Sequence, residues 1–473
     1  MKKILVRAHT NNMVPHTIDE VLAKDLFGHN PGNWLFLYGV LRTIVDDDIQ
    51  IDFTTGYSED LNKERIKRYN NEYDCLLLPL ANIFKEDWVE KLKVLTFLVK
   101  ALTIPCIVIG MGLQAESEDG NFDFPFNQTA KNFIDAVLQK SKIIGIRGEY
   151  TAKYLDYLGY RRNIDFMIIG CPSMYSFGLN LPRISSPAKN PKRVLLNTNP
   201  TIQSDSYNKW FLKFTNSLDD YGIDYYYLPQ RLDELRLIQY GTPIAKHMWN
   251  KVPDYFPVST KQPLYRHEVG INSVESWLAL NRTMDLTIGS RIHGCIISVL
   301  CGIPTLVLVK DTRMKELASF FGIPFLDISN IDETFDMLNY CETLDYSKIY
   351  NLHEQNFKNF IHFLDINQVP HIYQTNLYRT EIPYDRITQN KEIQIYYPIT
   401  SRDPEEVQQT LLQYTDYLQD YSRRFEKDYR HKLLSLYTTT YQQSFSIKKW
   451  KAAATAAEQE LSKPKQKKWL RTK

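Results

Sequence analysis

Short apolar runs alternate with amphipathic segments along roughly the first third of the chain. The apolar runs predict β-strands at Ile4–Val6, Ile49–Phe53, Cys75–Leu80, Pro105–Ile109, Ile143–Ile146 and Phe166–Ile169. Helical spacing of apolar residues predicts helices at Trp34–Thr43, Trp88–Leu102 and Phe133–Lys140, and in a segment that ends at Gly159. A run such as Cys75–Leu80, apolar throughout, is typical of a parallel strand covered on both faces. The alternation therefore predicts an α/β fold with a parallel sheet between helices.

The proline- and serine-containing segment Leu181–Lys192 is the best candidate linker, because the alternation restarts after it. We expect further strands at Arg193–Asn197, Asp224–Leu228, Leu286–Ile288, Thr305–Val309 and Pro324–Ile328. Helices are expected at Tyr207–Asp219, Ser273–Leu280, His293–Leu300 and Arg313–Phe321. The pattern predicts two similar Rossmann-like domains, residues 1–182 and 192–345, with a cleft between them.

The pattern changes after about residue 345, and residues 346–473 are expected to form a helical, charged extension. Ile349–Leu364 is amphipathic, residues 371–400 show no period, and Pro404–Gln443 reads as one or two helices. The lysines of residues 448–473 could attract the anionic inner leaflet of a membrane, although a solvated tail is the plainer interpretation. The helices could also mediate a homo-oligomer.

Composition narrows the classes of protein that fit. The 473 residues carry a net charge of +2, which gives no reason to expect a nucleic-acid partner. The six cysteines form no C-x-x-C pair and lie in or beside apolar runs, so we expect reduced core residues and no zinc. The N-terminal apolar run is too short for a signal peptide, and Lys100 and Pro105 interrupt the longest apolar region. A cytoplasmic protein is expected, with peripheral contact at the inner membrane face as an alternative.

The segment Asp285–Pro304, DLTIGSRIHGCIISVLCGIP, carries the strongest candidate site. It reads as a strand, a polar turn, a buried helix and a Gly-Pro stop. Arg291 and His293 lie between glycines at the start of the helix, with Ser290 before them and Gly294 after them. Helix N–H groups and a guanidinium together favour an anion. The plainer alternative is a helix start whose polar residues are already satisfied.

Other candidates follow predicted strands, at the sheet edge where ligands bind in such folds. Gly112 could allow close approach of a substrate, or could only close a turn. Arg147 could bind an anion, or could pair with Glu149 or Glu118 at the surface. Asp311 and Arg313 follow the strand that ends at Val309, and Asp311 could equally cap a helix. Asn33 is expected to cap the helix at Trp34–Thr43 and is a weaker cleft candidate.

The chain resembles the polysaccharide pyruvyl transferase family over roughly residues 28–330. The matching segments are GSRIHGCIISVLCGIP, LVLVKDTRMKELASFFGIP, IIGIRGEYTAKYLDYLGY, IGMGLQ and IGCPSMY, and their order and spacing along the chain also fit. The resemblance implies a two-domain fold similar to the GT-B glycosyltransferases. It also implies transfer of a pyruvyl group from phosphoenolpyruvate to a sugar, usually as a cyclic ketal in a cell-surface or exopolysaccharide glycan.

By this resemblance, the family's arginine-x-histidine motif falls on Arg291 and His293, which are associated with phosphoenolpyruvate binding. The arginine after the last strand segment of the first domain falls on Arg147. Many relatives have an acidic residue directly after that arginine, where this chain has Gly148, and the early glycine-aspartate is Gly32-Asn33 here. We therefore expect donor contacts from Arg147, Ser290, Arg291, His293 and Gly294.

The expected enzyme holds the donor through Arg291 and Arg147, and His293 either binds the leaving phosphate or acts as the acid. Gly112, Asn33, Asp311 and Arg313 are candidates for the cleft or the acceptor. No metal or cofactor is expected; phosphoenolpyruvate is a co-substrate, and the acceptor is a sugar or a lipid-linked oligosaccharide. Two alternatives stay open: a GT-B-like glycosyltransferase that uses a sugar nucleotide, and a non-catalytic scaffold for glycan assembly.

Overall fold

The computed structural model describes residues 2–57, 61–115, 120–184, 190–198, 202, 204–241, 267–416 and 418–419. The chain divides into two compact units, Met1–Leu412 and Gln413–Lys473. Most of the second unit, including the lysine-rich residues 448–473, lies outside the described residues, and so does Glu118 of the first unit. The account below therefore concerns the first unit.

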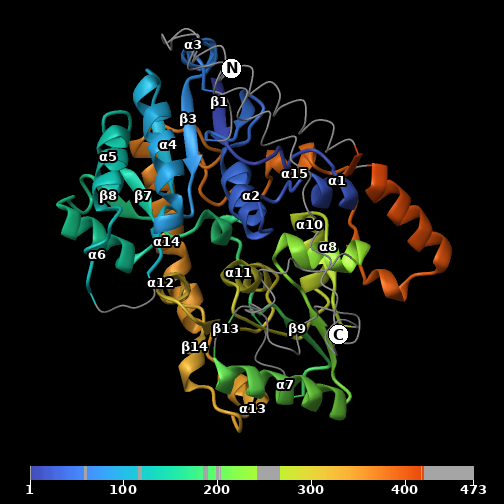
Figure 1. Cartoon of the computed structure of the whole chain (residues 1–473). Coiled ribbons are helices and arrows are strands. Elements are labelled where there is room, and N and C mark those ends of the chain that lie inside the picture. The colour runs from blue at the N-terminus through green and yellow to red at the C-terminus, as the bar shows by residue number, and fades with distance from the viewer. Residues whose placement is uncertain are drawn as a thin grey trace, which may run out of the picture. The chain divides into compact units, whose positions relative to one another are not determined.

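The first half of this unit contains a parallel sheet in the order β2-β1-β3-β5 (Figure 1). Its strands are β1 (Lys2–Arg7), β2 (Ile49–Thr54), β3 (Cys75–Pro79) and β5 (Cys106–Ile109). A parallel pair, β7 (Ile144–Ile146) and β8 (Phe166–Ile168), continues the sheet beyond β5. The backbone N–H groups of Gly110 and Met111 both donate to the carbonyl of Gly145 and make this junction.

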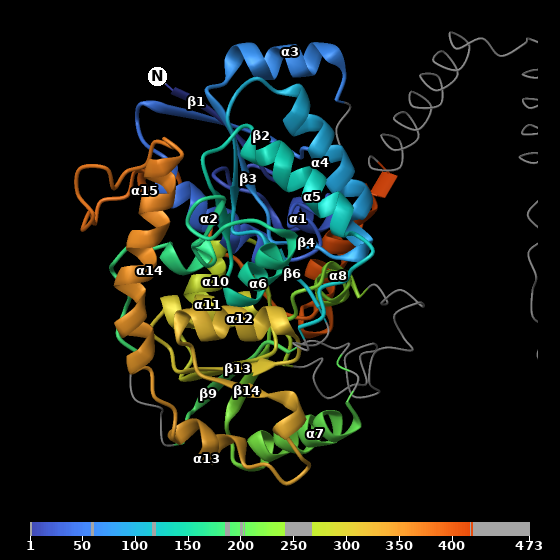
Figure 2. The same ribbon diagram turned by 90° about the vertical axis from the view of Figure 1, so that its left-hand side faces the viewer.

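Helices cover both faces of the first sheet because its strands β3 and β5 are apolar on both faces. The helices of this half are α1 (Ile18–Ala23), α2 (Gly32–Ile44), α3 (Lys63–Glu72), α4 (Val89–Ala101), α5 (Asn127–Leu138) and α6 (Glu149–Leu158). The helices α4 and α5 lie side by side (Figure 2), and Leu92 and Phe133 pack in one core with Leu76 and Leu78 of β3. Gly110, at the end of β5, instead lies against Phe36 of α2.

The second half repeats the same arrangement with a parallel sheet in the order β10-β9-β12-β13-β14. Its strands are β9 (Arg193–Leu196), β10 (Asp224–Tyr227), β12 (Leu286–Gly289), β13 (Thr305–Val309) and β14 (Phe325–Asp327). Its main helices are α7 (Asp205–Asp220), α8 (Leu232–Tyr240), α10 (Val274–Asn281), α11 (Ile292–Leu300) and α12 (Thr312–Phe321). In both sheets the first strand of the half lies between the second and the third. The predicted fold class of two Rossmann-like halves is confirmed.

The two faces of the second sheet have different neighbours. The helices α7 and α13 (Met337–Glu342) cover one face, where Trp210 and Cys341 share a core with Leu196 (Figure 1). The helices α11 and α12 contact α2 and α6 of the first half. The carboxyl ends of β12 and β13 therefore lead directly to the seam between the halves.

The helix α14 (Ser347–Ile366) connects both halves, although the sequence assigns it to a charged extension (Figure 2). Asn356 donates to the carbonyl of Phe320 in the second half, and Asn367 accepts from the backbone N–H of Lys142 in the first. Beyond it lie α15 (Pro383–Ile387) and β15 (Ile395–Tyr396), which pairs antiparallel with β11 (Gly270–Ile271). Residues 404–416 are helical as predicted. The limits 1–182, 192–345 and 346–473, and the proposed homo-oligomer, stay predictions.

Several element bounds differ from the sequence-based expectation. The helix α2 begins at Gly32, and Pro31 rather than Asn33 occupies the capping position, so the prediction of Asn33 as a helix cap is wrong. The side chain of Asn30 accepts from the N–H of Gly32 and takes over that role. The helix α3 escaped prediction because it buries only Tyr69. Among the described residues, no helix is both long enough and apolar enough to cross a membrane.

Candidate functional site

The turn between β12 and α11 packs tightly on the end of β9. A Cβ atom at Gly289 would lie 2.0 Å from Oδ1 of Asn197, and one at Gly294 would lie 2.4 Å from Nε2 of Gln230. Both glycines are therefore required by close packing. Ser290 is buried and its hydroxyl lies 3.1 Å from that of Thr198. Gly289, Ser290 and Gly294 hold the turn in place. Arg291, at the capping position, and His293, in the first turn of α11, therefore project from a rigid base.

Four cationic side chains gather at this edge of the second sheet and form what we call the cationic cluster. Its members are Arg147, Arg291, Lys310 and Arg313. Burial and the neighbouring charges of Arg291 and Arg313 lower the pKa of Lys310 to about 8. Burial also lowers the pKa of Arg291 and of Arg147, and Arg313 lowers both further. Like charges are seldom buried together unless a ligand neutralises them.

Three guanidinium groups of the cluster carry buried nitrogens that have no hydrogen-bond partner among the described residues. These nitrogens are Nη2 of Arg147, Nε of Arg291 and Nε of Arg313. Unsatisfied buried donors are rare in folded proteins, because each costs about 1–3 kcal/mol. Guanidinium N–H groups pair best with carboxylate or phosphate oxygens. The cluster is therefore built for an anion with several acceptor oxygens.

His293 lies at the centre of the seam, against two elements of the first half. Its Nε2 is 3.6 Å from Sγ of Cys171, which follows β8. A Cβ atom at Gly32, in the first turn of α2, would lie only 2.5 Å from Nδ1. Burial and the charges of Arg147 and Arg313 lower the pKa of His293 to about 3, so the ring is neutral at neutral pH. Gly32 is the residue that leaves space beside Nδ1.

A sequence model of one family matches residues 30–311, which are more than half of the chain and include Gly32, Arg147, Arg291, His293 and Lys310. The protein belongs to the polysaccharide pyruvyl transferase family. A comparison with curated protein sequences gives no significant match.

Solved structures with similar chain traces share little sequence with this pyruvyl transferase family member. The UDP-bound MnaA of S. aureus is 11% identical with a TM-score of 0.42, covering 78% of this chain and 99% of its own. The UDP-GlcNAc 2-epimerase of Neisseria meningitidis, bound to UDP-GlcNAc, is 14% identical with a TM-score of 0.42, covering 78% and 100%. That of Methanocaldococcus jannaschii is 10% identical with a TM-score of 0.38, covering 77% and 99%.

In this family member, Arg147 is anchored by the first half of the molecule. Its Nε donates to the carbonyl of Gly110 at 3.0 Å, and Nη1 donates to Oδ1 of Asn82 at 2.6 Å. A Cβ atom at Gly112 would lie 2.8 Å from Cδ of Arg147, so Gly112 makes room for this side chain. The alternative pairing of Arg147 with Glu149 is wrong, because Glu149 binds Arg162. Nη2 is thus the part of Arg147 that remains for a ligand.

Carboxylates flank the cluster and offset part of its charge. Asp311 caps α12 by accepting from the N–H of Met314, and it pairs with Arg313 at 3.0 Å. Its predicted alternative role as a helix cap is therefore seen. Glu316 accepts from the N–H and the hydroxyl of Thr151 in the first half. Burial raises the pKa of Glu316 to about 7, so it adds only part of a negative charge near neutral pH.

Asn33 points away from the cluster. Its Nδ2 donates to the carbonyls of Phe27 and Gly28, and this stabilises the turn before α2. It also lines a small cavity of about 40 Å³ at the ends of β1 and β3, together with His9. Burial, more than the charge of Arg7, lowers the pKa of His9 to about 4. This cavity and the cluster are separated by Phe36, whose ring lies 5.9 Å from the Arg147 guanidinium carbon.

Sequence reasoning missed Lys310 and the role of Gly32. Lys310 directly follows the buried strand β13, so the rule that ligands bind beyond strand ends could have found it. The contact between Gly32 and His293 joins residues from different halves, so no pattern of neighbouring residues in the sequence predicts it. No group of three or more His, Cys, Asp and Glu side chains within the described ranges could hold a metal ion.

Proposed function

We propose that this family member transfers the pyruvyl group of phosphoenolpyruvate to two hydroxyls of one sugar in a glycan. The observation that carries the proposal is the cationic cluster around His293, with three guanidinium nitrogens that find no acceptor among the residues that the structure describes. Phosphoenolpyruvate supplies what the cluster lacks, a carboxylate and a phosphate on one small molecule. Family membership supplies the class of reaction.

The positions of the side chains suggest how the donor is held. Arg291 stands at the start of α11, where backbone N–H groups add to its attraction for phosphate. Arg147 can take a carboxylate through Nη2, and Lys310 adds a point charge near Arg291. His293 enters neutral and offers Nδ1 beside Gly32. A bound anion raises the pKa of the imidazole, so the same ring can donate to phosphate or deliver a proton.

The reaction balances without a redox step. A proton adds to the methylene carbon of phosphoenolpyruvate and creates an oxocarbenium-like centre at the neighbouring carbon. One sugar hydroxyl bonds to that carbon and loses its proton, and the carbon–oxygen bond to phosphate breaks. A second hydroxyl of the same sugar then closes the ketal and loses its proton. The cluster stabilises the developing charge and orients the donor.

The remaining expectations belong to the same proposal. The acceptor is a sugar or a lipid-linked oligosaccharide of a cell-surface or exopolysaccharide glycan. Phosphoenolpyruvate is a cytosolic metabolite, so the reaction takes place in the cytoplasm, with peripheral contact at the inner membrane face for a lipid-linked acceptor. Phosphoenolpyruvate serves as co-substrate, and the proposed steps use only this donor, the acceptor and the side chains named above.

A donor assay tests the proposal directly. The full-length protein is incubated with a neutral oligosaccharide panel and either phosphoenolpyruvate or UDP-sugars, and phosphate release and acceptor mass are measured. We expect phosphate release with phosphoenolpyruvate, and an acceptor heavier by one pyruvate minus one water. His293→Ala should abolish both signals without lowering the melting temperature. Transfer from a UDP-sugar instead, or full activity of the His293 variant, would overturn the assignment.

A further inference from the structure

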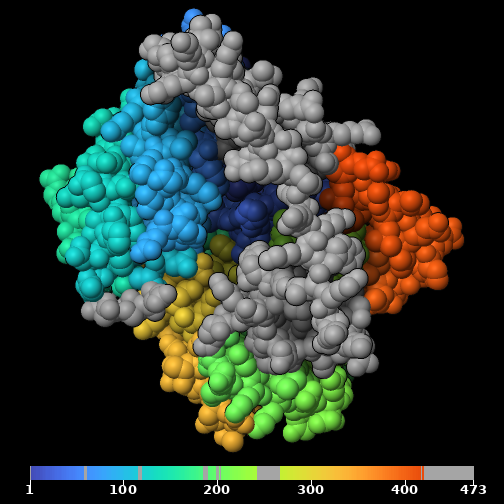
Figure 3. All heavy atoms as spheres, viewed as in Figure 1, coloured from blue at the N-terminus to red at the C-terminus, as the bar shows by residue number. Residues whose placement is uncertain are grey.

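A second cavity, of about 200 Å³, opens on the other side of the first turn of α2. We call it the acidic pocket and define it by Asn12, His16, Trp34, Ser273, Glu275 and Lys391. Its walls come from the loop after β1, the start of α10 and the segment after α15. In the space-filling view, the dark blue surface of the N-terminal residues is recessed between the light blue and orange parts of the chain (Figure 3).

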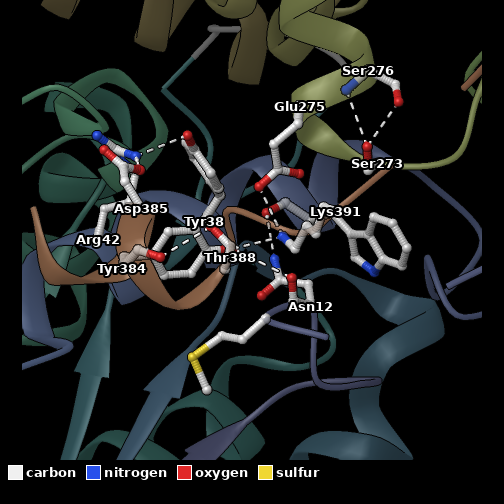
Figure 4. A network of polar contacts seen from close by, with 12 residues as sticks. Asn12, Tyr38, Arg42, Ser273, Glu275, Ser276, Tyr384, Asp385, Thr388 and Lys391 are labelled. Atoms are coloured by element: carbon white, nitrogen blue, oxygen red, sulfur yellow. Dashed lines mark hydrogen bonds and ion pairs between the residues drawn. The ribbon is translucent and has the colours of Figure 1, made fainter. Parts of the chain in front are cut away.

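The charge of this pocket is opposite to that of the cationic cluster. Its wall contains three glutamates, Glu20, Glu275 and Glu392, and one lysine, Lys391. Lys391 is already occupied: Nζ donates to Glu275 at 2.8 Å and to the hydroxyl of Tyr384 at 3.2 Å (Figure 4). An anionic ligand would therefore face carboxylates, and the lysine of the wall would not be free to pair with it.

The unsatisfied groups of the pocket are acceptors. Asn12 is 3% exposed, and its Oδ1 has no hydrogen-bond partner among the described residues; the same holds for Oε2 of Glu275. The Asn12 amide nitrogen Nδ2 donates to the backbone carbonyl of Trp34. Because a carbonyl can only accept a hydrogen bond, this contact fixes which end of the amide is the oxygen. Buried acceptors require a ligand with hydroxyl or amino hydrogens. Trp34 adds an aromatic surface of the kind on which the C–H face of a sugar ring packs.

We propose that the acidic pocket binds one neutral or amino sugar unit. A water occupies about 30 Å³ of liquid, so the cavity has the volume of several waters, the size class of a single sugar ring. Asn12, His16 and Lys391 lie outside residues 30–311, so this wall is not part of the region that matches the family. That the sugar is a unit of the acceptor glycan rests on the proposed function; the binding of a sugar does not.

The position of the pocket suits recognition of an acceptor. Gly32 contacts His293, and Trp34, two residues further along the same helix, lines the pocket. With 3.6 residues per turn, residues two apart on a helix point to nearly opposite sides of it, and a helix with its side chains is about 10–12 Å across. A glycan with one unit in the pocket would therefore reach the cationic cluster with a unit further along its chain.

Saturation-transfer NMR on the full-length protein tests this, with N-acetylglucosamine, glucosamine and galactose as probes and glucuronate as an acidic control. We expect transfer to at least one neutral or amino sugar, with the signal for glucuronate weaker by roughly tenfold. Val14 is 43% exposed and lines the pocket, so Val14→Trp should fill it without disturbing the core and remove the signal. Ile164→Trp, at an exposed site in the first half, is the matched control and should keep it.

The outcomes separate this proposal from the proposed function. Arg291→Met should lose donor binding but retain sugar binding. Absence of sugar binding to the wild-type protein, persistence of binding in Val14→Trp, equal binding of glucuronate, or loss of binding in Arg291→Met would each overturn the pocket assignment. Sugar binding without any turnover of phosphoenolpyruvate would instead refute the donor proposal and leave the pocket standing.

Discussion

The cationic cluster and the acidic pocket lie on two sides of the first turn of α2, and they differ in the kind of hydrogen-bonding group that each leaves unsatisfied. Within the described part of the chain, the cluster holds buried donors without acceptors, at Arg147, Arg291 and Arg313. In the same part of the chain, the pocket holds buried acceptors without donors, at Asn12 and Glu275. Each deficit specifies the chemistry that would relieve it, an oxyanion in one case and a hydroxyl-rich or amino ligand in the other. The comparison teaches that the kind of hydrogen-bonding group left unsatisfied, donor or acceptor, indicates the class of ligand to test at each site.

The largest expected effect separates the cluster from ordinary structural charges. Arg291→Met should reduce turnover with phosphoenolpyruvate by about 100- to 1000-fold, the cost of removing one partner from a buried charge interaction. Arg291 lies near the cation of Arg313 and near the buried carboxylate of Glu234, so its loss relieves one charge contact and weakens another, and the melting temperature should change by only a few degrees. Steady-state kinetics and thermal unfolding measure the two quantities.

Arg162→Met is the matched control for this prediction. Arg162 is a surface arginine that pairs with Glu149 and Asp156, so its loss should leave turnover unchanged. A large fall in melting temperature for Arg291→Met, with turnover falling only in proportion to unfolding, would mean that Arg291 is structural.

A smaller loss is expected from the contact between the halves. Gly32→Ala places a methyl group within 2.5 Å of Nδ1 of His293 and should displace the imidazole. We expect turnover to fall by roughly 10- to 100-fold while the helix persists, since alanine is a good helix former. In a double-mutant cycle with His293→Ala, measured as affinity for phosphoenolpyruvate, the Gly32 substitution should have no further effect. Additive losses would show that Gly32 acts through something other than His293.

The pH dependence of donor affinity should reveal Lys310. The pKa of this lysine is lowered to about 8, so it is cationic below that pH and loses its proton as pH rises through it. The phosphate of the donor is fully ionised in the same range. Affinity for phosphoenolpyruvate should therefore be constant below about pH 8 and fall by up to about tenfold per pH unit above it.

Calorimetric titration between pH 7 and pH 10 measures this dependence. Lys310→Arg keeps its charge throughout that range, so its affinity should vary little with pH. If the wild-type protein and this variant show the same decline, the titrating group is not Lys310.

The sequence predicted the strands of the two main sheets and three of the four members of the cluster, but not the pocket. Fully apolar parallel strands such as β3 give a strong local signal, and the Arg-x-His turn lies within one short segment. The pocket joins Asn12 and Lys391, which lie far apart in the sequence, and depends on the pairing of β11 with β15 across the fold. Such long-range contacts leave no periodicity to read. The same limit applies to Gly32 and His293.

The smallest effect concerns the stability of the seam that holds both sites. Glu316 joins α12 to the start of α6, and burial raises its pKa from 4.5 to about 7. The folded state thus binds this proton more tightly than the unfolded state, so its contribution to stability is full below about pH 4.5 and is lost as pH rises through 7. Glu316→Gln, which has no such proton, should unfold at a temperature that changes less between pH 5 and pH 8 than that of the wild-type protein, by a few degrees.

Asp165→Asn, at an exposed ion pair with Arg161, provides the surface control. If the unfolding temperature of Glu316→Gln depends on pH as strongly as that of the wild-type protein, the titrating group is not Glu316. The contacts of Glu316 between the two halves would then not depend on pH.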